Sequence, residues 1–231
     1  MIYGFYSDTH KGDGSKADNF RRVEPRFIKM LQFLDAICEG IFNLGDDKEV
    51  TQGIGSKEEI LEDITVEHAE ALKIEKSIGV VKVCGNHDEG TIPLKKIDFS
   101  PVDGLRIIAE HGHRFDRWCS KLWFIGRIGA KIAGWLERKG FWNAEAILGK
   151  FAERVPGRKE KLSTYFDKMK RELEVLSLGA IRGIYLIGHV HRWKIEHVGS
   201  DTLVAVGHCS SGHCECVLVD TETGKVKKKK F

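Results

Sequence analysis

Short apolar runs alternate along the chain with longer segments in which apolar residues recur every three or four positions. Five of these runs predict buried strands, at residues 2–7, 41–44, 80–84, 105–109 and 184–187. Helical spacing begins at Pro25 and ends before Gly40, and a second helical segment extends from Ser56 to about Ile78. After residue 192 the pattern changes to short strands separated by turns. The alternation indicates an α/β fold with a β-rich end.

The start of the second helical segment carries a specific signal. Ser56 and Glu59 have the spacing of a capping box, in which each side chain bonds to the other residue's backbone N–H. Gly79 follows the last apolar residue of the segment and predicts its end. His68, in the middle of the segment, has the pattern of an ordinary surface or half-buried residue.

Residues 117–178 have helical character and separate two predicted strands by far more than a plain connection requires. We therefore expect one domain over 1–231, with a helical lid inserted at about 117–178. The segment 117–175 holds 14 Lys and Arg against 7 Asp and Glu, a local charge of +7. Its apolar stripe is formed by Trp118, Leu122, Ile125, Ile132 and Leu136, and its basic edge by Arg127, Lys131 and Arg138.

Two interpretations of this insertion stay open. In the first, the stripe packs into the core and the basic edge is solvated. In the second, the helix covers a functional site, its basic edge attracts an anionic substrate, and its apolar stripe holds an acyl chain or contacts a membrane surface.

Composition narrows the class of protein. The chain has 231 residues, and its 37 Lys and Arg nearly balance its 34 Asp and Glu, which argues against a surface that wraps nucleic acid. No apolar stretch is long enough to cross a membrane, and residues 1–5 do not resemble a secretion signal. The six cysteines show no disulfide spacing. We expect a cytoplasmic protein with free thiols, which could also lie peripherally at the inner face of the membrane.

Polar residues follow the apolar runs in a repeated way. Asp, Asn and His appear directly after five of the predicted strands, within the segments 7–10, 44–47, 85–88, 110–113 and 188–191. Ligands gather at the carboxyl ends of strands in α/β sheets, so these residues should meet. Carboxylate and imidazole donors without cysteine favour ions such as Zn, Mn or Fe. Seven or more donors suit two ions, an arrangement used for phosphoryl transfer.

The order of these motifs resembles the calcineurin-like metallophosphoesterase superfamily: Asp8-x-His10, Gly45-Asp46, Gly85-Asn86-His87-Asp88, His111 and Gly188-His189-x-His191. The resemblance implies a four-layer αββα sandwich of two mixed β-sheets. It also implies a site for two divalent ions, with Mn²⁺ expected first and Fe, Zn, Ni or Co as alternatives. Asp8, His10 and His191 would hold one ion, Asn86, His111 and His189 the other, and Asp46 would bridge them. His87 would be the catalytic imidazole, oriented by Asp88.

Three further stretches resemble UDP-2,3-diacylglucosamine hydrolase-like proteins: Gly12–Phe20, His111–Asp116 and the β-rich end 203–219. Within the second stretch, His113, Arg114 and Asp116 are candidates for substrate binding. Two positions depart from that group, which usually has Gly-Asp-Trp at 207–209 and an apolar residue at Asp47. The substrate would then be a phosphorylated small molecule, such as a nucleotide sugar or a lipid precursor.

Hydrolysis of a phosphodiester or pyrophosphate bond is therefore the expected reaction. A general phosphodiesterase or nuclease on the same site is one alternative, although nucleic acid is the less favoured partner. A non-catalytic metal-binding interaction protein is the alternative from another class.

One group of residues has no assigned role: His208, Cys209, His213, Cys214 and Cys216. Cys214 and Cys216 alternate on a predicted strand and should point to the same face. A separate zinc site is disfavoured, because the spacing is not that of a closed site.

Overall fold

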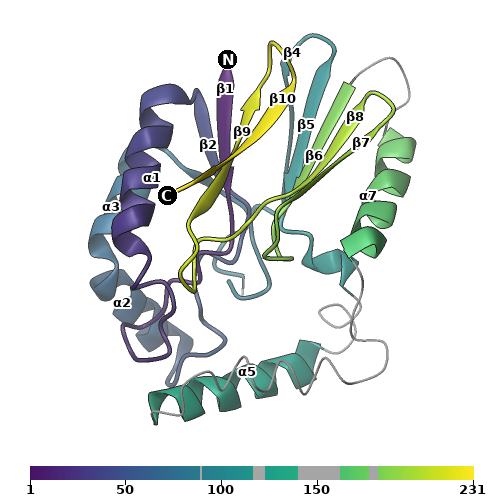
Figure 1. The fold of residues 1–231 in the computed structure, drawn as a ribbon. Coiled ribbons are helices and arrows are strands. Elements are labelled where there is room, and N and C mark those ends of the chain that lie inside the picture. Colours follow the sequence, from purple (N-terminus) through teal and green to yellow (C-terminus); the bar gives the residue numbers. More distant parts are fainter. Residues whose placement is uncertain (89, 117–122, 140–161, 177–181) are drawn as a thin grey trace.

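Two five-stranded β-sheets face each other, and helices cover their outer faces (Figure 1). This computed structural model describes residues 1–88, 90–116, 123–139, 162–176 and 182–231. The layers run from α1 and α3, through the two sheets, to α7 (Figure 1). The expected four-layer sandwich of two mixed sheets is thus confirmed.

The first sheet has the strand order β10-β9-β1-β2-β3. The central strands β1, β2 and β3 are parallel, whereas β9 and β10 continue the sheet in antiparallel pairing. The bounds are Ile2–Tyr6 for β1, Gly40–Asn43 for β2, Val81–Lys82 for β3, Glu215–Asp220 for β9 and Lys225–Lys230 for β10.

The second sheet has the order β4-β5-β6-β8-β7. Its centre is parallel, from β5 through β6 to β8, and both edge strands are antiparallel. The bounds are Lys96–Val102 for β4, Leu105–Glu110 for β5, Arg182–Ile187 for β6, Lys194–Val198 for β7 and Asp201–Ala205 for β8.

Six helical elements are described: α1 at Glu24–Ile37, α2 at Lys57–Glu67, α3 at Ala69–Ser77, the 3-10 turn η1 at His113–Phe115, α5 at Trp123–Arg138 and α7 at Leu162–Leu176. The capping box at Ser56 and Glu59 is present in full and starts α2. Pro25 lies in the first turn of α1, as expected.

Three apolar layers hold the sandwich together. Phe5, Ile107 and Leu186 belong to the buried core between the sheets. A second layer joins the first sheet to the helices that cover it, and a third joins α7 to the second sheet. Because both faces of each central strand are buried, these strands read as continuous apolar runs rather than as alternating patterns.

The segment from Ser56 to Ile78 is two helices and not one, because the chain turns at His68, which caps α2 and precedes α3. The side chain of His68 is fully buried, contrary to expectation. Its Nε2 lies 2.8 Å from Asp18 Oδ2 and its Nδ1 lies 3.1 Å from Glu24 Oε2. Two carboxylates therefore hold the imidazole at the break in the helix.

Two features of the sheets were not anticipated. The pattern of β4 is interrupted by Ser100 and Pro101, and this edge strand was missed. The lysine-rich segment Lys225–Lys230 forms β10, a second strand that was missed. There Lys228 pairs with Glu215 at 2.7 Å, and Lys229 lies 3.8 Å from the centre of the Phe33 ring.

The expected lid lies partly outside the described residues, which exclude Trp118 and Leu122. Within it, α5 and α7 confirm the helical character. Ile132 is exposed rather than packed, and Leu136 is half-buried. Arg138 does not belong to a solvated edge, because its Nη1 donates to the Gln52 carbonyl oxygen at 2.8 Å. None of the described helices has the length and apolar character needed to span a membrane.

The contacts of His68 predict a pH-dependent contribution to stability. Burial alone lowers the pKa of His68, but the bonds to Asp18 and Glu24 outweigh burial and raise it above 6.5. Protonated His68 should therefore stabilise the fold fully below pH 6.5, and this contribution should be lost as pH rises through the higher folded-state pKa.

The measurement compares the wild type with His68→Gln, which retains hydrogen bonding but cannot become charged. Urea unfolding of both proteins in chelator should show a stability difference that is larger at about pH 6 than at about pH 9. An equal difference in unfolding free energy at both pH values would contradict a raised pKa of His68 in the folded protein.

Candidate metal centre

The five predicted strand ends meet at one edge of the sandwich. Asp8 and His10 follow β1, Asp46 follows β2, and Asn86 follows β3. His111 follows β5, and His189 and His191 follow β6. Strand ends from both sheets thus supply the side chains, and the expected convergence is observed.

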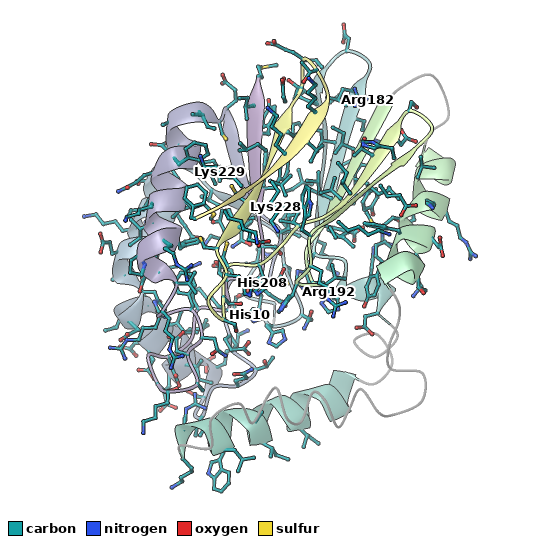
Figure 2. The ribbon with its side chains drawn as sticks, in the orientation of Figure 1. His10, Arg182, Arg192, His208, Lys228 and Lys229 are labelled. Carbon is teal, nitrogen blue, oxygen red and sulfur yellow. The ribbon has the colours of Figure 1, made fainter. Side chains whose placement is uncertain are left out.

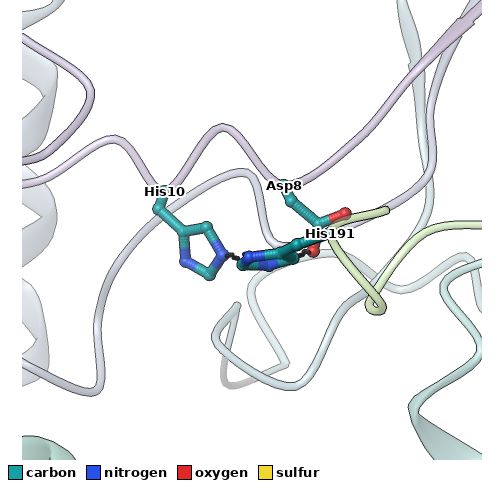
Figure 3. A group of neighbouring side chains, drawn as sticks. All are labelled: Asp8, His10 and His191. Atoms are coloured by element: carbon teal, nitrogen blue, oxygen red, sulfur yellow. Dashed lines mark hydrogen bonds and ion pairs between the residues drawn. The ribbon is translucent and has the colours of Figure 1, made fainter. Parts of the chain in front are cut away.

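The first group of donor atoms comprises Asp8, His10 and His191, whose ligand atoms all lie within 4.8 Å of one another. Figure 3 shows the imidazole of His191 between the other two side chains. His191 Nε2 lies 3.0 Å from Asp8 Oδ1 and 3.3 Å from His10 Nε2. His191 is thus brought from a distant part of the sequence to Asp8 and His10, and the three side chains present donors to one point.

The second group comprises Asp46, His111 and His189. His111 Nε2 lies 3.1 Å from Asp46 Oδ2 and 3.1 Å from Asn86 Oδ1. The same Asp46 oxygen lies 3.8 Å from His10 Nε2 in the first group. A single carboxylate oxygen therefore faces imidazoles of both groups.

The backbone at these positions has an uncommon conformation. Six non-glycine residues in the described part of the chain have positive φ, and the sixth is Ser211. The other five are candidate ligands: Asp8 (55°), His10 (48°), Asp46 (51°), His189 (64°) and His191 (50°). Such strain persists only where the surroundings enforce it, and it clusters at functional sites.

Two glycines allow the loops to approach closely. A Cβ at Gly85 would collide with the carboxylate and backbone nitrogen of Asp46, and a Cβ at Gly188 would collide with Ser7. Gly45 and Gly112 instead make left-handed turns, at φ of 100° and 92°. Glycines at these strand ends thus permit close approach at Gly85 and Gly188 and left-handed turns at Gly45 and Gly112.

The electrostatics match a cation site. Burial disfavours the charged form of Asp46 and Asp8, but the facing imidazoles outweigh burial and hold the pKa of both carboxyl groups below the usual value. Burial also lowers the pKa of His111, but Asp46, Asp8 and Asp88 overcome it and raise that pKa to about 9. Ionised carboxylates beside imidazoles, without a cysteine in either group, form a donor set that fits Mn, Fe or Zn.

His87 stands beside this centre, and its acidic partner is Glu49. The ring Nδ1 lies 2.8 Å from the Glu49 carboxylate and 2.8 Å from Thr51 Oγ1. Glu49 also lies 2.8 Å from His10 Nδ1, and it forms a third group with both histidines. Sequence analysis missed Glu49, although a third acidic residue shortly after Asp46 was the available signal.

Asp88 was expected to orient His87, and the structure corrects that role. Its carboxylate accepts backbone N–H groups of Gly85, Asp46, Asp47 and Lys48, at 2.7, 3.0, 2.9 and 3.0 Å. Burial and the charges of Asp46 and Asp47 raise the pKa of Asp88 to about 6. Asp88 therefore fixes the loop that carries Asp46, while Glu49 and Thr51 hold the His87 ring.

The three candidate substrate-binding residues differ in position. His113 packs against the His111 ring at 5.4 Å, and Asp116 Oδ2 lies 3.3 Å from His189 Nε2, so both adjoin the second group. The guanidinium of Arg114 is instead bound by Glu110 and Glu172. These contacts give Arg114 a structural role between η1, β5 and α7.

His208 lies at the edge near His10, and Figure 2 shows both with Arg192 below the sheets. Its ring stacks on His191 with centroids 5.0 Å apart, and it packs against His213 at 4.6 Å. Burial and the neighbouring imidazoles lower the pKa of His208 to about 4. The neutral ring of His208 therefore packs against the first group of donors through His191.

A buried ion network supports the loops from behind. Lys11 and Asp47, which follow His10 and Asp46 in sequence, form an ion pair, and Lys11 is fully buried. Lys82 Nζ lies 2.7 Å from Asp47 and 2.6 Å from Glu75, and Lys11 Nζ lies 3.1 Å from Glu75. Two cations thus balance two carboxylates, which explains how an acidic residue is accommodated at position 47.

This network predicts strong coupling between Lys11 and Asp47. Lys11→Met or Asp47→Asn alone leaves the buried network with one uncompensated charge, and each should cost about 3–5 kcal/mol of unfolding free energy. The double variant removes one charge of each sign and leaves Lys82 paired with Glu75. Urea unfolding should therefore give a double-variant loss well below the sum of the single losses. Additive losses would show that the two residues act independently.

No protein-family model matches the sequence, and no curated protein matches it either. Solved structures match over the whole chain at low identity. Vacuolar protein sorting 29 from Cryptosporidium parvum is 10% identical, with 97% of its chain covered and a TM-score of 0.50. A dimetal phosphatase from Danio rerio is 10% identical, with 98% covered and a TM-score of 0.48. An archaeal phosphodiesterase is 13% identical, with 100% covered and a TM-score of 0.45. The likeness to the first of these supports the sandwich fold and extends no further than the fold.

Proposed function

We propose that the protein is a metal-dependent phosphoesterase that hydrolyses a phosphodiester or pyrophosphate bond. One observation carries this proposal: Asp46 Oδ2 faces His111 at 3.1 Å and His10 at 3.8 Å, so one carboxylate is shared by two groups of nitrogen and oxygen donors. Paired sites of this kind suit in-line displacement at phosphorus.

The donor groups define which residues would hold each ion. Asp8, His10 and His191 would hold the first, and Asn86, His111 and His189 the second, with Asp46 shared. Mn²⁺ is our first choice, while Fe, Zn, Ni and Co also accept these donors. When bound, the ions lower the pKa of a water molecule and offset charge on the phosphate oxygens.

His87 performs the remaining chemistry in this proposal. Its backbone N–H donates to Asp46 Oδ1 at 2.8 Å, which places the residue beside the shared carboxylate. Glu49 and Thr51 hold Nδ1, so the ring is fixed and Nε2 is the nitrogen assigned to the substrate. Protonated His87 would contact a phosphate oxygen or give a proton to the leaving oxygen.

The proposed substrate is a phosphorylated small molecule, with His113 and Asp116 at the second group as candidate contacts. A general phosphodiesterase or nuclease would use the same residues. It would differ by substrate binding that weakens steeply with salt, because it would neutralise several phosphates along a strand. The alternative of a non-catalytic metal-binding interaction protein would be expected to have lost ligands, whereas all seven donors are present and meet at this site.

Removing the ions should abolish turnover. We expect hydrolysis of bis(4-nitrophenyl) phosphate with Mn²⁺, loss of activity in chelator, and recovery when Mn²⁺ is restored. Asp46→Ala should be the most damaging single ligand change, because Asp46 serves both groups, whereas Asp35→Ala on the exposed face of α1 should retain full activity. Turnover that survives removal of metal would refute the proposal.

The variant His87→Ala tests the role of the imidazole, and its rate of hydrolysis should fall about 10²–10⁴-fold. Metal content should stay at the wild-type level, and its loss would show that His87 is a ligand instead.

We also propose that α5 docks the protein on an anionic membrane surface. Ile128, Ile132 and Trp135 are 45%, 49% and 51% exposed, and at 100° per residue they share one face with the exposed Lys131 and Lys139. The other side of α5 meets the body of the protein through buried Ala133 and Gly134 and through Arg138. An apolar face flanked by lysines is typical of interfacial helices.

Co-sedimentation with vesicles tests this contact. Wild-type protein should bind vesicles that contain phosphatidylglycerol, more weakly as salt is raised and not at all on neutral vesicles. The double variant Ile132→Ser with Trp135→Ser should lose binding, while Val66→Ser, which removes an exposed apolar side chain from α2, should retain it. Equal binding by both variants would reject the role of α5.

A further inference from the structure

Sulfur-bearing side chains gather in the apolar layer between α1 and the first sheet. Met30 belongs to α1, Cys209 follows β8, Cys214 directly precedes β9, and Cys216 lies within β9, all in one buried cluster. Cys209 Sγ lies 3.9 Å from Met30 Sδ, and Cys214 Sγ lies 3.8 Å from the same sulfur. We call Met30, Cys209 and Cys214 the sulfur triad.

Two of the three sulfur–sulfur distances in the sulfur triad match those of ligands around a single metal ion. A metal–sulfur bond is about 2.3 Å long. Three sulfurs placed around an ion at that distance lie about 4.0 Å apart in a trigonal plane and about 3.8 Å apart in a tetrahedral arrangement, by simple geometry from the same bond length. The two sulfur–sulfur distances to Met30 fall at these values. Both cysteine sulfurs therefore lie at ligand-like distances from the sulfur of Met30.

The donor chemistry selects a soft, monovalent ion. A thioether and two thiols, with no carboxylate or imidazole in the triad, favour Cu(I) over Zn²⁺ or Mn²⁺. The surroundings are apolar, since the same cluster contains Phe27, Leu31 and Leu34. The hard donors of the candidate metal centre belong to separate groups and include no cysteine among the described residues. The two donor sets thus discriminate between different classes of ion.

The loop between the two cysteines reaches the surface of the protein. Residues 211–213 are exposed, and Ser211 and Gly212 adopt left-handed φ of 48° and 86°. Only this short turn lies between Cys209 and Cys214 in the chain. The backbone N–H of Cys209 donates to the carbonyl oxygens of Ser7 and Asp8 at 3.2 Å, so the loop also adjoins the first strand end of the metal centre.

We propose that Met30, Cys209 and Cys214 form a three-sulfur site for Cu(I), distinct from the histidine and carboxylate centre. Binding would form two Cu–thiolate bonds and one Cu–thioether bond, and the two thiol protons would pass to solvent. The oxidation states of copper and sulfur do not change in this step. The proposal does not depend on the phosphoesterase function.

The test is a Cu(I) titration of the reduced, full-length protein without oxygen, against the chromophoric chelator bicinchoninate. Wild-type protein should take one Cu(I) per chain, and the affinity should fall about tenfold or more in Cys209→Ser with Cys214→Ser. The matched control, Cys38→Ser with Cys84→Ser, removes two other described cysteines and should bind as the wild type does.

Met30→Leu isolates the thioether, because it conserves volume in the core and should fold normally. This variant should also bind Cu(I) more weakly, and thermal unfolding checks that its fold is intact. Prior loading with Mn²⁺ should leave Cu(I) uptake unchanged. Wild-type affinity in the double cysteine variant or in Met30→Leu would overturn the three-sulfur site, as would displacement of Cu(I) by Mn²⁺.

Discussion

The carboxylate of Asp46 is the point on which the arrangement of this protein depends. Its Oδ2 faces His111 on one side and His10 on the other, while its Oδ1 accepts the backbone N–H of His87. These partners come from strands of both sheets, so neither sheet builds the site alone. The parallel centres of the two sheets bring their carboxyl ends to the same edge, and this shared edge makes the juxtaposition possible.

A rigid backbone is required to hold several carboxylates and imidazoles close together at one edge of the sandwich. The Asp88 carboxylate accepts four backbone N–H groups around the Asp46 loop, and the Lys11–Asp47 pair ties that loop to the one that carries His10. Such surroundings can enforce left-handed conformations that aspartate and histidine adopt uncommonly. The buried charges and hydrogen bonds behind the loops therefore hold the ligand residues in their strained backbone conformations.

The periphery adds features that the metal centre does not explain. The apolar face of α5 points to solvent although the helix is fastened to the body through Arg138. The sulfur triad lies in the apolar layer between α1 and the first sheet and presents softer donors than the metal centre does. Hard donors at the sheet edge and soft donors in the apolar layer give each region its own preference among ions.

The sequence by itself determined the strand and helix alternation, the capping box at Ser56, and the seven donors that converge after the strands. These features depend on local patterns, namely apolar runs, helix-start chemistry and polar residues at strand ends. The sequence did not reveal β4, whose pattern is interrupted by Ser100 and Pro101, nor the break at His68, which long-range contacts with Asp18 and Glu24 hold in place.

Only the tertiary structure decided which acidic residue serves which partner. Asp88 neighbours His87 in sequence but bonds to the backbone of another loop, and Glu49 reaches His87 across 38 positions. It likewise decided that Asp47 is neutralised by Lys11 and Lys82 and that Met30 meets two cysteines about 180 residues away. Side-chain partnerships of this kind depend on how layers pack, because the chain brings distant residues together only after the sheets and helices have formed.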